Sequence, residues 1–330
     1  MLKSNDELKK EILRILPNNL RGVLDSIKID FRLLLEIRIR VNKPILIYYD
    51  NEEYFINIKN GLVKYPEDAY MITIDEVKES LQYICNYSLY AYEEDIKQGF
   101  ITVIGGHRVG LAGKIVLEQG DIKNIKYITC INIRVSHQVI GCGKKVIKYL
   151  YDDNDSIYHT LIVSPPMSGK TTLLRDIIRI ISNGSGLHKS MTVGVVDERS
   201  EIGACYNGVP QNDIGIRTDI LDCCPKSEGM MMLLRSMSPK IIAVDEIGTL
   251  RDIEAIEYVI NCGCKLLATV HGNGIEDVKN KPLLGKLVRE RVFERYIILN
   301  NQNRVGNVKE IFDMRGTVLA NQIGDEDVCL

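Results

Sequence analysis

The sequence predicts an α/β fold, with a mostly parallel sheet in the second half of the chain and a smaller α+β domain in the first half. In the second half, apolar runs of strand length alternate with segments whose apolar residues recur at helical spacing, as in proteins with parallel sheets. In the first half, alternating and glycine-punctuated segments predict antiparallel strands. A length of 330 residues also suggests two domains, which we place at residues 1–145 and 146–330.

The composition limits the class of protein. Lys and Arg together number 42 against 44 Asp and Glu, so the net charge of −2 offers no global positive field for nucleic acid. The nine cysteines form no C-x-x-C pair and there are only five histidines, which argues against a zinc site or a disulfide framework and fits a reducing cytosol. No apolar run reaches the ~18 residues of a membrane span, and the charged, amphipathic N-terminus does not resemble a signal peptide, so we expect a cytoplasmic protein.

The first half begins with two helical patterns and continues with two strands and a third helix. In order, these elements are expected at residues 8–16, 21–31, 34–41, 45–49 and 74–85. The strand at residues 34–41 alternates, so Glu36, Arg38 and Arg40 share one face. That face is either solvated, or its arginines contact a partner or the phosphates bound by a neighbouring subunit.

A glycine-punctuated region follows, up to residue 137, and predicts several short antiparallel strands. Arg108 and Arg134 end two of these runs. There they are either surface charges or contacts to a nucleotide that a neighbouring subunit binds. Residues 141–155 combine glycines, lysines and an acidic run, and we expect them to form the linker to the second domain.

The strongest motif lies between residues 156 and 179. The branched apolar run at residues 157–163 predicts a buried strand, and an apolar pattern of helical period starts at Leu173. The segment between them follows the phosphate-binding pattern G-x-x-x-x-G-K-[ST], except that serine stands at the first position. The expected nucleotide-binding residues are Ser164, Pro165, Pro166, Met167, Ser168, Gly169, Lys170, Thr171 and Thr172.

Each part of this loop has a physical role. A helix N-terminus offers backbone N–H groups and a favourable dipole to phosphate, and Gly169 lets the backbone approach closely. Lys170 would contact the β- and γ-phosphate oxygens, and Thr171 would place its hydroxyl on Mg²⁺. Ser164 in place of glycine either preserves the turn, with a φ that serine tolerates, or weakens nucleotide binding.

Acidic residues follow two further apolar runs that predict buried strands. Asp197 and Glu198 come after the first run, and Asp245 and Glu246 come after the second. In open α/β sheets the carboxyl ends of the strands border the ligand crevice. Asp245 would hold Mg²⁺ through water, and Glu246 would act as the general base that polarises the attacking water.

One more predicted strand, at residues 265–270, ends in polar side chains. Thr269, His271 or Asn273 would report whether a γ-phosphate is present; alternatively, His271 caps the next helix. The remaining expected elements of the second half are a strand at residues 191–196, an extended segment at residues 213–218 and helices at residues 226–237 and 252–261.

The motifs SPPMSGKTTLLRD, VVDERSEI, IIAVDEIG and ATVHGN resemble, in this order and spacing, the Walker A, acidic, Walker B and His boxes of the ATPases that power type II and type IV secretion and pilus machines. Together with EIRIRVNKPI and GGHRVGLAGK, they make the chain resemble the stage III sporulation protein AA family of endospore-forming bacteria over essentially its whole length. The resemblance implies an N-terminal domain, a RecA-like P-loop ATPase domain, ATP and Mg²⁺ as ligands, and a homo-oligomeric, hexameric ring. It also implies a mother-cell motor that docks on membrane proteins of a channel to the forespore.

The same resemblance assigns roles to single residues. Lys170 and Thr171 match the Walker A pair, Asp197 and Glu198 the acidic box, Asp245 and Glu246 the Walker B acids, and His271 the His box. Pilus motors usually have Glu-Asp in the acidic box, so which of these two carboxylates acts stays open; we assign Asp197 to the metal and Glu198 to catalysis. The candidates for an arginine supplied by a neighbouring subunit are Arg108, Arg134, Arg199, Arg217 and Arg235.

Two other functions remain possible from the sequence. A RecA-like nucleic-acid motor would need a basic groove with aromatic side chains, whereas this chain is slightly acidic and has no Trp and five Phe. A nucleotide-dependent assembly scaffold with little turnover is compatible with Ser164, but it has no use for a general base at Glu246.

Overall fold

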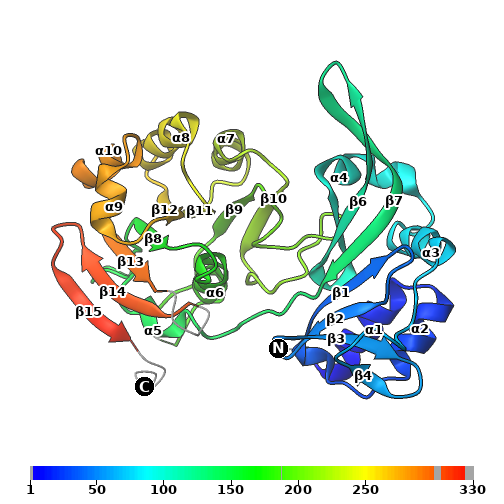
Figure 1. Ribbon diagram of the computed structural model, residues 1–330. Helices are drawn as coiled ribbons and strands as arrows, with labels where there is room; N and C mark the ends of the chain where they lie inside the picture. The colour runs from blue at the N-terminus through cyan, green and yellow to red at the C-terminus, as the bar shows by residue number, and fades with distance from the viewer. Residues whose placement is uncertain (1–2, 187, 301–305, 324–330) are drawn as a thin grey trace. The chain divides into compact units, whose positions relative to one another are not determined.

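The chain forms two compact units in the computed structural model, which describes residues 3–186, 188–300 and 306–323. The units comprise residues 1–137 and 138–330. Each has its own hydrophobic core. Each also has its own sheet, as Figure 1 shows.

The first unit is a seven-stranded antiparallel sheet in the order β4-β3-β2-β1-β7-β6-β5. Apolar residues of α1, α2, α3 and α4 pack against one face of this sheet in a single core. Polar side chains can therefore lie on the opposite face. Its elements are α1 (Asn5–Arg14), α2 (Asn18–Asp25), β1 (Leu34–Arg40), β2 (Leu46–Tyr49), β3 (Glu52–Asn57), β4 (Gly61–Val63), α3 (Ile74–Ile84), α4 (Glu93–Gln98), β5 (Phe100–Val103), β6 (His107–Glu118) and β7 (Asp121–Arg134), with 3₁₀ turns η1 (Phe31–Leu33), η2 (Leu89–Tyr92) and η3 (Ile104–Gly106).

Local chemistry explains the helix starts of this unit. Ser4 and Glu7 form a capping box that starts α1, and Thr73 and Glu76 form another that starts α3. Pro17 is the residue before α2, so that this helix begins directly after the proline. The expectation of a helix at residues 21–31 is wrong in its bounds, because the observed helix α2 begins at Asn18 and ends at Asp25.

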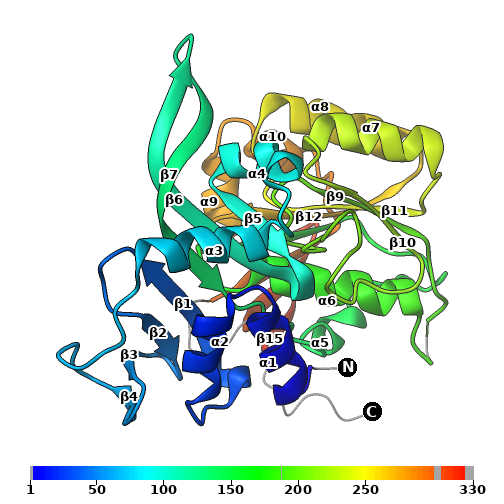
Figure 2. The same cartoon turned by 90° about the vertical axis from the view of Figure 1, so that its right-hand side faces the viewer.

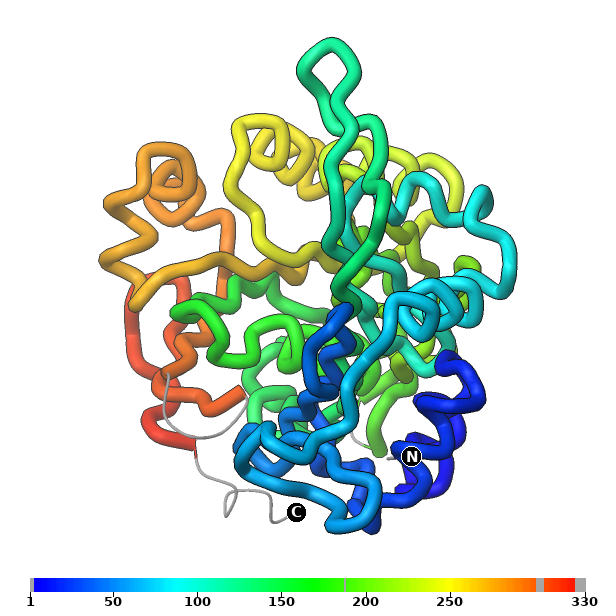
Figure 3. Tube along the Cα trace, turned by 45° about the vertical axis from the view of Figure 1, so that its right-hand side comes forward, coloured from blue at the N-terminus to red at the C-terminus, as the bar shows by residue number. Residues whose placement is uncertain are grey.

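The glycine-punctuated region differs from the prediction of several short strands. After β5 it forms one long hairpin, β6 with β7, whose outer half extends beyond the rest of the sheet (Figure 3). The register shifts at Gly113 without ending the strand. Glycine is required at this position, because a Cβ would meet the backbone of the facing strand at 2.7 Å. Glycine here marks a bulge rather than a turn.

The second unit is an eight-stranded sheet in the order β10-β9-β11-β12-β8-β13-β14-β15, of which the first six strands are parallel. Helices cover both faces, with α5 and α6 on one side and α7 to α10 on the other (Figure 2). The elements are α5 (Lys144–Ile147), β8 (Thr160–Ser164), α6 (Lys170–Asn183), β9 (Val193–Asp197), β10 (Thr218–Asp222), α7 (Lys226–Ser236), β11 (Ile241–Val244), α8 (Leu250–Asn261), β12 (Lys265–His271), α9 (Ile275–Asn280), α10 (Leu284–Arg289), β13 (Arg295–Leu299), β14 (Val308–Asp313) and β15 (Val318–Ile323).

The extended segment expected at residues 213–218 leads into β10, which begins at Thr218 beside β9. The segment expected to be a linker packs with the second unit, since the backbone N–H groups of Gly141 and Gly143 donate to the Asp176 carboxylate on α6 at 2.9 and 2.7 Å. The compact units therefore divide after His137.

Candidate active site

The candidate active site lies where the central parallel strands of the second unit end. Strands β9, β11, β12 and β8 are neighbours and run in the same direction, so their carboxyl ends meet at one edge of the sheet. His271 on β12 pairs with Ser164 on β8, and Asp245 and Glu246 directly follow β11. The fold thereby brings the phosphate loop, the Walker B acids and the His box together.

The phosphate loop leaves β8 after Ser164, which is fully buried and still part of the strand. The Ser164 hydroxyl donates to the carbonyl of Pro165 at 2.9 Å. The left-handed conformation falls later in the loop, at Met167 (φ 60°) and Gly169 (φ 83°). A serine is therefore tolerated at the first position of the motif, because that position does not require the backbone freedom of glycine.

Lys170 and Thr171 begin α6 and face the Walker B acids. The Thr171 hydroxyl donates to Oδ2 of Asp245 at 2.5 Å. The Lys170 ammonium lies 3.7 Å from Oδ1 of Asp245 and 3.8 Å from Oε2 of Glu246, and its side chain is only 10% exposed. The structure thus brings four of the predicted site residues together, with the Thr171 hydroxyl on Asp245 and the Lys170 cation beside both carboxylates.

Thr269 orders the Walker B acids, a role that the sequence did not indicate. Its buried hydroxyl donates to Oδ1 of Asp245 and accepts the backbone N–H of Glu246 at 2.9 Å. The sequence predicts Thr269, His271 or Asn273 as the reporter of the γ-phosphate, and in the structure the partners of Thr269 are the two acids that follow the neighbouring strand. Thr269 reaches the two acids because β12, which carries Thr269, pairs in parallel with β11, which precedes the acids. This contact can be predicted only once the strand order is known.

Glu246 is held by positive and polar groups. Arg199 donates from Nη1 to Oε2 of Glu246 at 2.8 Å, and Nε2 of His271 lies 3.4 Å from Oε1. The backbone of Glu246 is left-handed, with φ 56°, an uncommon conformation for a residue with a Cβ. His271 thus contacts the predicted base itself, whereas the next helix, α9, starts after Gly274.

The acidic box lies outside this cluster. Asp197 is 2% exposed, and its two oxygens accept the backbone N–H groups of Glu201, Ile202 and Gly203 at 2.8–2.9 Å. Burial raises the pKa of Asp197 to about 6, although these hydrogen bonds oppose the shift. Glu198 forms an ion pair with the buried Lys226. Asp197 thus closes its own loop, whereas Glu198 pairs with the first residue of α7. The metal role of Asp197 and the catalytic role of Glu198 stay predictions.

The residues present fit a magnesium–nucleotide complex. The N-cap of α6 is Gly169, which has no side chain to cap the helix, so the dipole and N–H groups of the helix N-terminus face the loop. The hydroxyl of Thr171 and the carboxylate of Asp245 are hard oxygen ligands of the kind that Mg²⁺ prefers, and Mg²⁺ usually takes only one or two carboxylates in addition to phosphate oxygens and water. Within the described ranges, no group of three or more His, Cys, Asp and Glu side chains forms a separate metal site.

The first unit brings together two predicted arginines that are far apart in the sequence. Arg108 on β6 pairs with Arg134 on β7, and Arg134 pairs in turn with Glu36 on β1. The alternation of β1 places Arg38 and Arg40 on the same face, which we call the arginine face (Arg38, Arg40, Arg108 and Arg134). Glu36 contacts Arg38 at 2.9 Å and Arg134 at 3.9 Å, so one carboxylate serves two guanidinium groups.

The arginine face borders a small cavity and contains buried polar atoms. A cavity of about 220 Å³ is lined by Arg38, Arg40 and Asn132, among others. Nε of Arg40 and Oδ1 of Asn132 are buried there, with no hydrogen-bond partner among the described residues. The Arg108 guanidinium lies 3.5 Å from the ring centroid of Phe100, which fixes its orientation.

The other three candidate arginines lie elsewhere. Arg199 contacts Glu246 of its own chain. Arg217 donates to the backbone carbonyl of Ser182 at 3.1 Å, and so holds the segment before β10 against α6. Arg235 lines an open groove of about 700 Å³ between α7 and α8.

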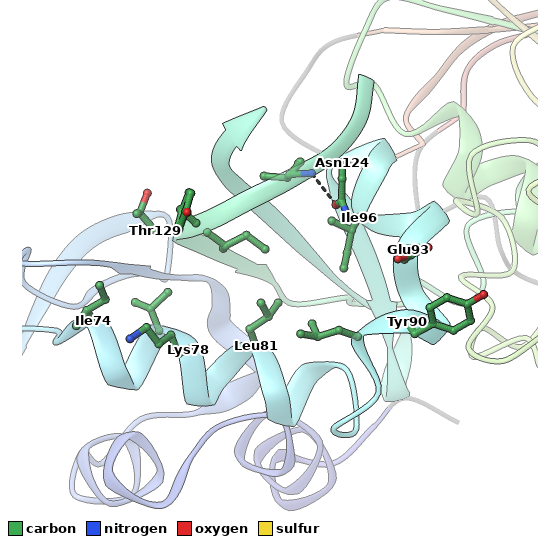
Figure 4. Close-up of a pocket in the computed structure, with 13 residues that line it drawn as sticks. Ile74, Lys78, Leu81, Tyr90, Glu93, Ile96, Asn124 and Thr129 are labelled. Carbon is green, nitrogen blue, oxygen red and sulfur yellow. Dashed lines mark hydrogen bonds between the residues drawn. The ribbon is translucent and has the colours of Figure 1, made fainter. Parts of the chain in front are cut away.

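The first unit also contains an apolar cavity of about 410 Å³ between α3, α4 and β7. Ile74, Leu81 and Ile96 point into it, and Tyr90 lies at its edge (Figure 4). Its lining is mostly apolar, so it lacks the cluster of charged groups that the candidate active site has.

Comparisons with known proteins confirm the family resemblance. Residues 6–319 match the family described as "Sporulation stage III, protein AA". The chain is 39% identical to Stage III sporulation protein AA of Bacillus subtilis (strain 168) over 315 residues, which is 95% of this chain and 98% of the relative.

Solved structures of ATPases share the fold. The ATPase DotB of Legionella pneumophila superposes with a TM-score of 0.53 at 15% identity, covering 89% of this chain and 80% of that one. The pilus retraction motor PilT with bound ADP gives 0.52 at 16% identity, covering 87% of this chain and 77% of that one. The predicted fold class is thus confirmed: a RecA-like P-loop domain with a smaller N-terminal α+β domain. In the described part of the chain, no helix has the length and apolar character needed to cross a membrane.

Proposed function

Because this chain belongs to the stage III sporulation protein AA family, we propose that it is an ATPase that energises a channel complex between mother cell and forespore. The observation that carries the proposal is the convergence of Lys170 and Thr171, at the start of α6, with Asp245 and Glu246, at the end of β11. A protein that only bound a partner would have no use for a lysine held between two carboxylates at a helix N-terminus whose N-cap is glycine.

The start of α6 binds the nucleotide. Its N–H groups and the Lys170 ammonium neutralise phosphate charge, and they stabilise the charge that develops on the γ-phosphoryl group during transfer to water. Bound Mg²⁺ would supply further positive charge at the β- and γ-phosphate oxygens. Thr171 and Asp245 would hold the metal, and Thr269 keeps the Asp245 carboxylate oriented toward Thr171.

Glu246 orients the attacking water as general base. Its carboxylate is 30% exposed, so water can reach it, and it lies 3.8 Å from the lysine that binds the phosphates. His271, beside the second oxygen of Glu246, holds the carboxylate in place. This arrangement favours turnover over a scaffold that binds ATP without hydrolysing it.

An arginine pair from the first unit of a neighbouring subunit completes the site. Arg108 and Arg134 are suited to this role because they lie side by side on the arginine face, where Arg134 is 64% exposed. Two guanidinium groups can share the oxygens of one phosphate group, for which arginine geometry is well matched. Activity then depends on a homo-oligomer, which we propose to be a hexameric ring.

The output is motion of one unit against the other. ATP and ADP states differ in the charge at the γ-phosphate position, so they differ in how strongly they attract the neighbour's arginines. Membrane proteins of the sporulation channel receive this motion, and the motor lies on the mother-cell side of the membrane through them.

The experiment that tests this proposal measures steady-state ATPase activity against protein concentration, with molecular mass from light scattering and Glu246→Gln as the companion variant. We expect specific activity to rise with concentration as a ring-sized species forms. We expect the Gln variant to bind ATP and form the ring without turnover. Activity of a monomer that does not depend on concentration would contradict the shared site, and turnover by Glu246→Gln at the wild-type rate would exclude Glu246 as the base.

A further inference from the structure

The carboxylate of Glu246 occupies the place of an anion between two cations. Its Oε2 accepts a hydrogen bond from Arg199 at 2.8 Å and lies 3.8 Å from the Lys170 ammonium. Lys170 is the residue proposed to bind the terminal phosphates. The oxygen shared by Lys170 and Arg199 is therefore positioned like an oxygen of a bound phosphate group.

Arg199 is placed by the loop that carries it. The Asp197 carboxylate closes this loop by accepting three backbone N–H groups. On the other side, Arg175 of α6 donates to the carbonyls of Ile202 and Glu201 at 2.7 and 2.5 Å. Because α6 also begins with Lys170, one helix fixes both the phosphate-binding lysine and the loop that presents Arg199.

The ion pair of Arg199 with Glu246 contributes little to folding. The Arg199 side chain is 61% exposed, and exposed ion pairs contribute about 0–1 kcal/mol. At the same time, Glu246 keeps an uncommon left-handed backbone in this position. Backbone conformations of this kind cluster at functional sites, where the surrounding structure imposes them.

Building on the proposed function, we propose that Arg199 senses the γ-phosphate of the ATP bound by its own chain, and that Glu246 takes the place of this group when it is absent. A terminal phosphate carries more negative charge and more acceptor oxygens than a carboxylate, so it attracts Lys170 and Arg199 more strongly. When Arg199 moves to the phosphate, Glu246 is released from it and becomes available to orient water. ADP has no γ-phosphate, so Arg199 stays with Glu246.

The test compares the affinities of the full-length chain for magnesium–ADP and for a magnesium complex of a non-hydrolysable ATP analogue, measured by calorimetry. In Arg199→Ala we expect affinity for the analogue to fall about tenfold, since a hydrogen bond to a charged group is lost, with ADP affinity unchanged. Arg199→Lys retains the charge and should recover part of the loss.

The matched control is Arg32→Ala in the first unit. Arg32 forms an ion pair with Asp30 that resembles the pair of Arg199 with Glu246. The distance from guanidinium nitrogen to carboxylate oxygen is 2.6 Å in the first pair and 2.8 Å in the second. The exposed fractions of the arginine and the acid are 63% and 31% in the first pair, and 61% and 30% in the second. We expect Arg32→Ala to leave both affinities unchanged. Both alanine variants should melt close to the wild type, since each loses one exposed pair.

The same titrations in a Glu246→Gln background separate the two roles of Arg199. If Arg199 contacts the γ-phosphate, Arg199→Ala still weakens binding of the analogue when Glu246 is replaced. If Arg199 only holds Glu246, the effect disappears in that background, and the inference is overturned. Equal loss for ADP and the analogue, or no loss for either, also overturns it. A wild-type chain that binds neither nucleotide would refute the proposed function, and this inference with it.

Discussion

Replacing Thr269 by valine tests how the Walker B acids are positioned. Valine has nearly the same shape as threonine but lacks the hydroxyl, which in the structure donates to Asp245 and accepts the N–H of Glu246. Thr269 is fully buried, so water cannot replace these bonds. The N–H of Glu246 would be left without a partner, at a cost of about 1–3 kcal/mol.

That cost converts to measurable changes. The second unit comprises residues 138–330, and in domains of this size 1 kcal/mol corresponds to about 2–4 °C, so we expect the melting temperature to fall by roughly 2–12 °C. ATP turnover should fall by on the order of tenfold to a hundredfold, since a small displacement of catalytic groups has effects of that size.

The assays are thermal melting followed by circular dichroism and steady-state ATPase activity, with Thr269→Ser as the matched control. Serine keeps the hydroxyl and removes only a methyl group, so we expect turnover close to the wild type. If the valine and serine variants melted at the same temperature and hydrolysed ATP at the same rate, Thr269 would not position the acids, and the reasoning would be refuted.

Two further predictions follow from the structure. In Arg108→Ala and Arg134→Ala, ATP binding should persist while ATP turnover falls at least about tenfold, because these arginines act on the transition state from across a subunit boundary. If calorimetry showed that either variant no longer binds ATP, the arginine would instead belong to the primary nucleotide-binding site. Burial raises the pKa of Asp197 from 3.8 to about 6, so the folded chain binds a proton at this carboxylate more tightly than the unfolded chain does. The free energy of unfolding should therefore fall as pH rises from about 4 to 6. Urea titrations should show that Asp197→Asn removes this pH dependence, and an unchanged slope would argue against the shift.

The motifs of the second half could be predicted because each is local. A buried strand, a loop that ends in Gly-Lys-Thr and an amphipathic helix lie consecutively in the sequence. The apolar runs before Asp245 and His271 are each long enough to specify a strand. The fold class and the place of the phosphate loop follow from such patterns. Ser164 is compatible with the motif because it lies in the strand itself, which only the structure shows.

Contacts between distant residues could not be predicted. The pairing of Arg108 with Arg134 depends on one long hairpin, whereas the glycines suggested several short strands. The acids of Asp197 and Asp245 have the same local pattern, an apolar run followed by a carboxylate, yet one closes its own loop and the other faces α6. Only the strand order and the course of the following loop separate these two roles.

The measurement that tests the central claim most directly is a calorimetric titration of magnesium–ATP into the wild-type chain and into Lys170→Ala. Lys170 lies buried between Asp245 and Glu246 at the start of α6, so its removal should leave these two carboxylates to repel the phosphates. We predict binding to the wild-type chain and none that is measurable to the variant, with both folded by circular dichroism. Equal affinities for the two chains would contradict the assignment of this loop as the nucleotide site.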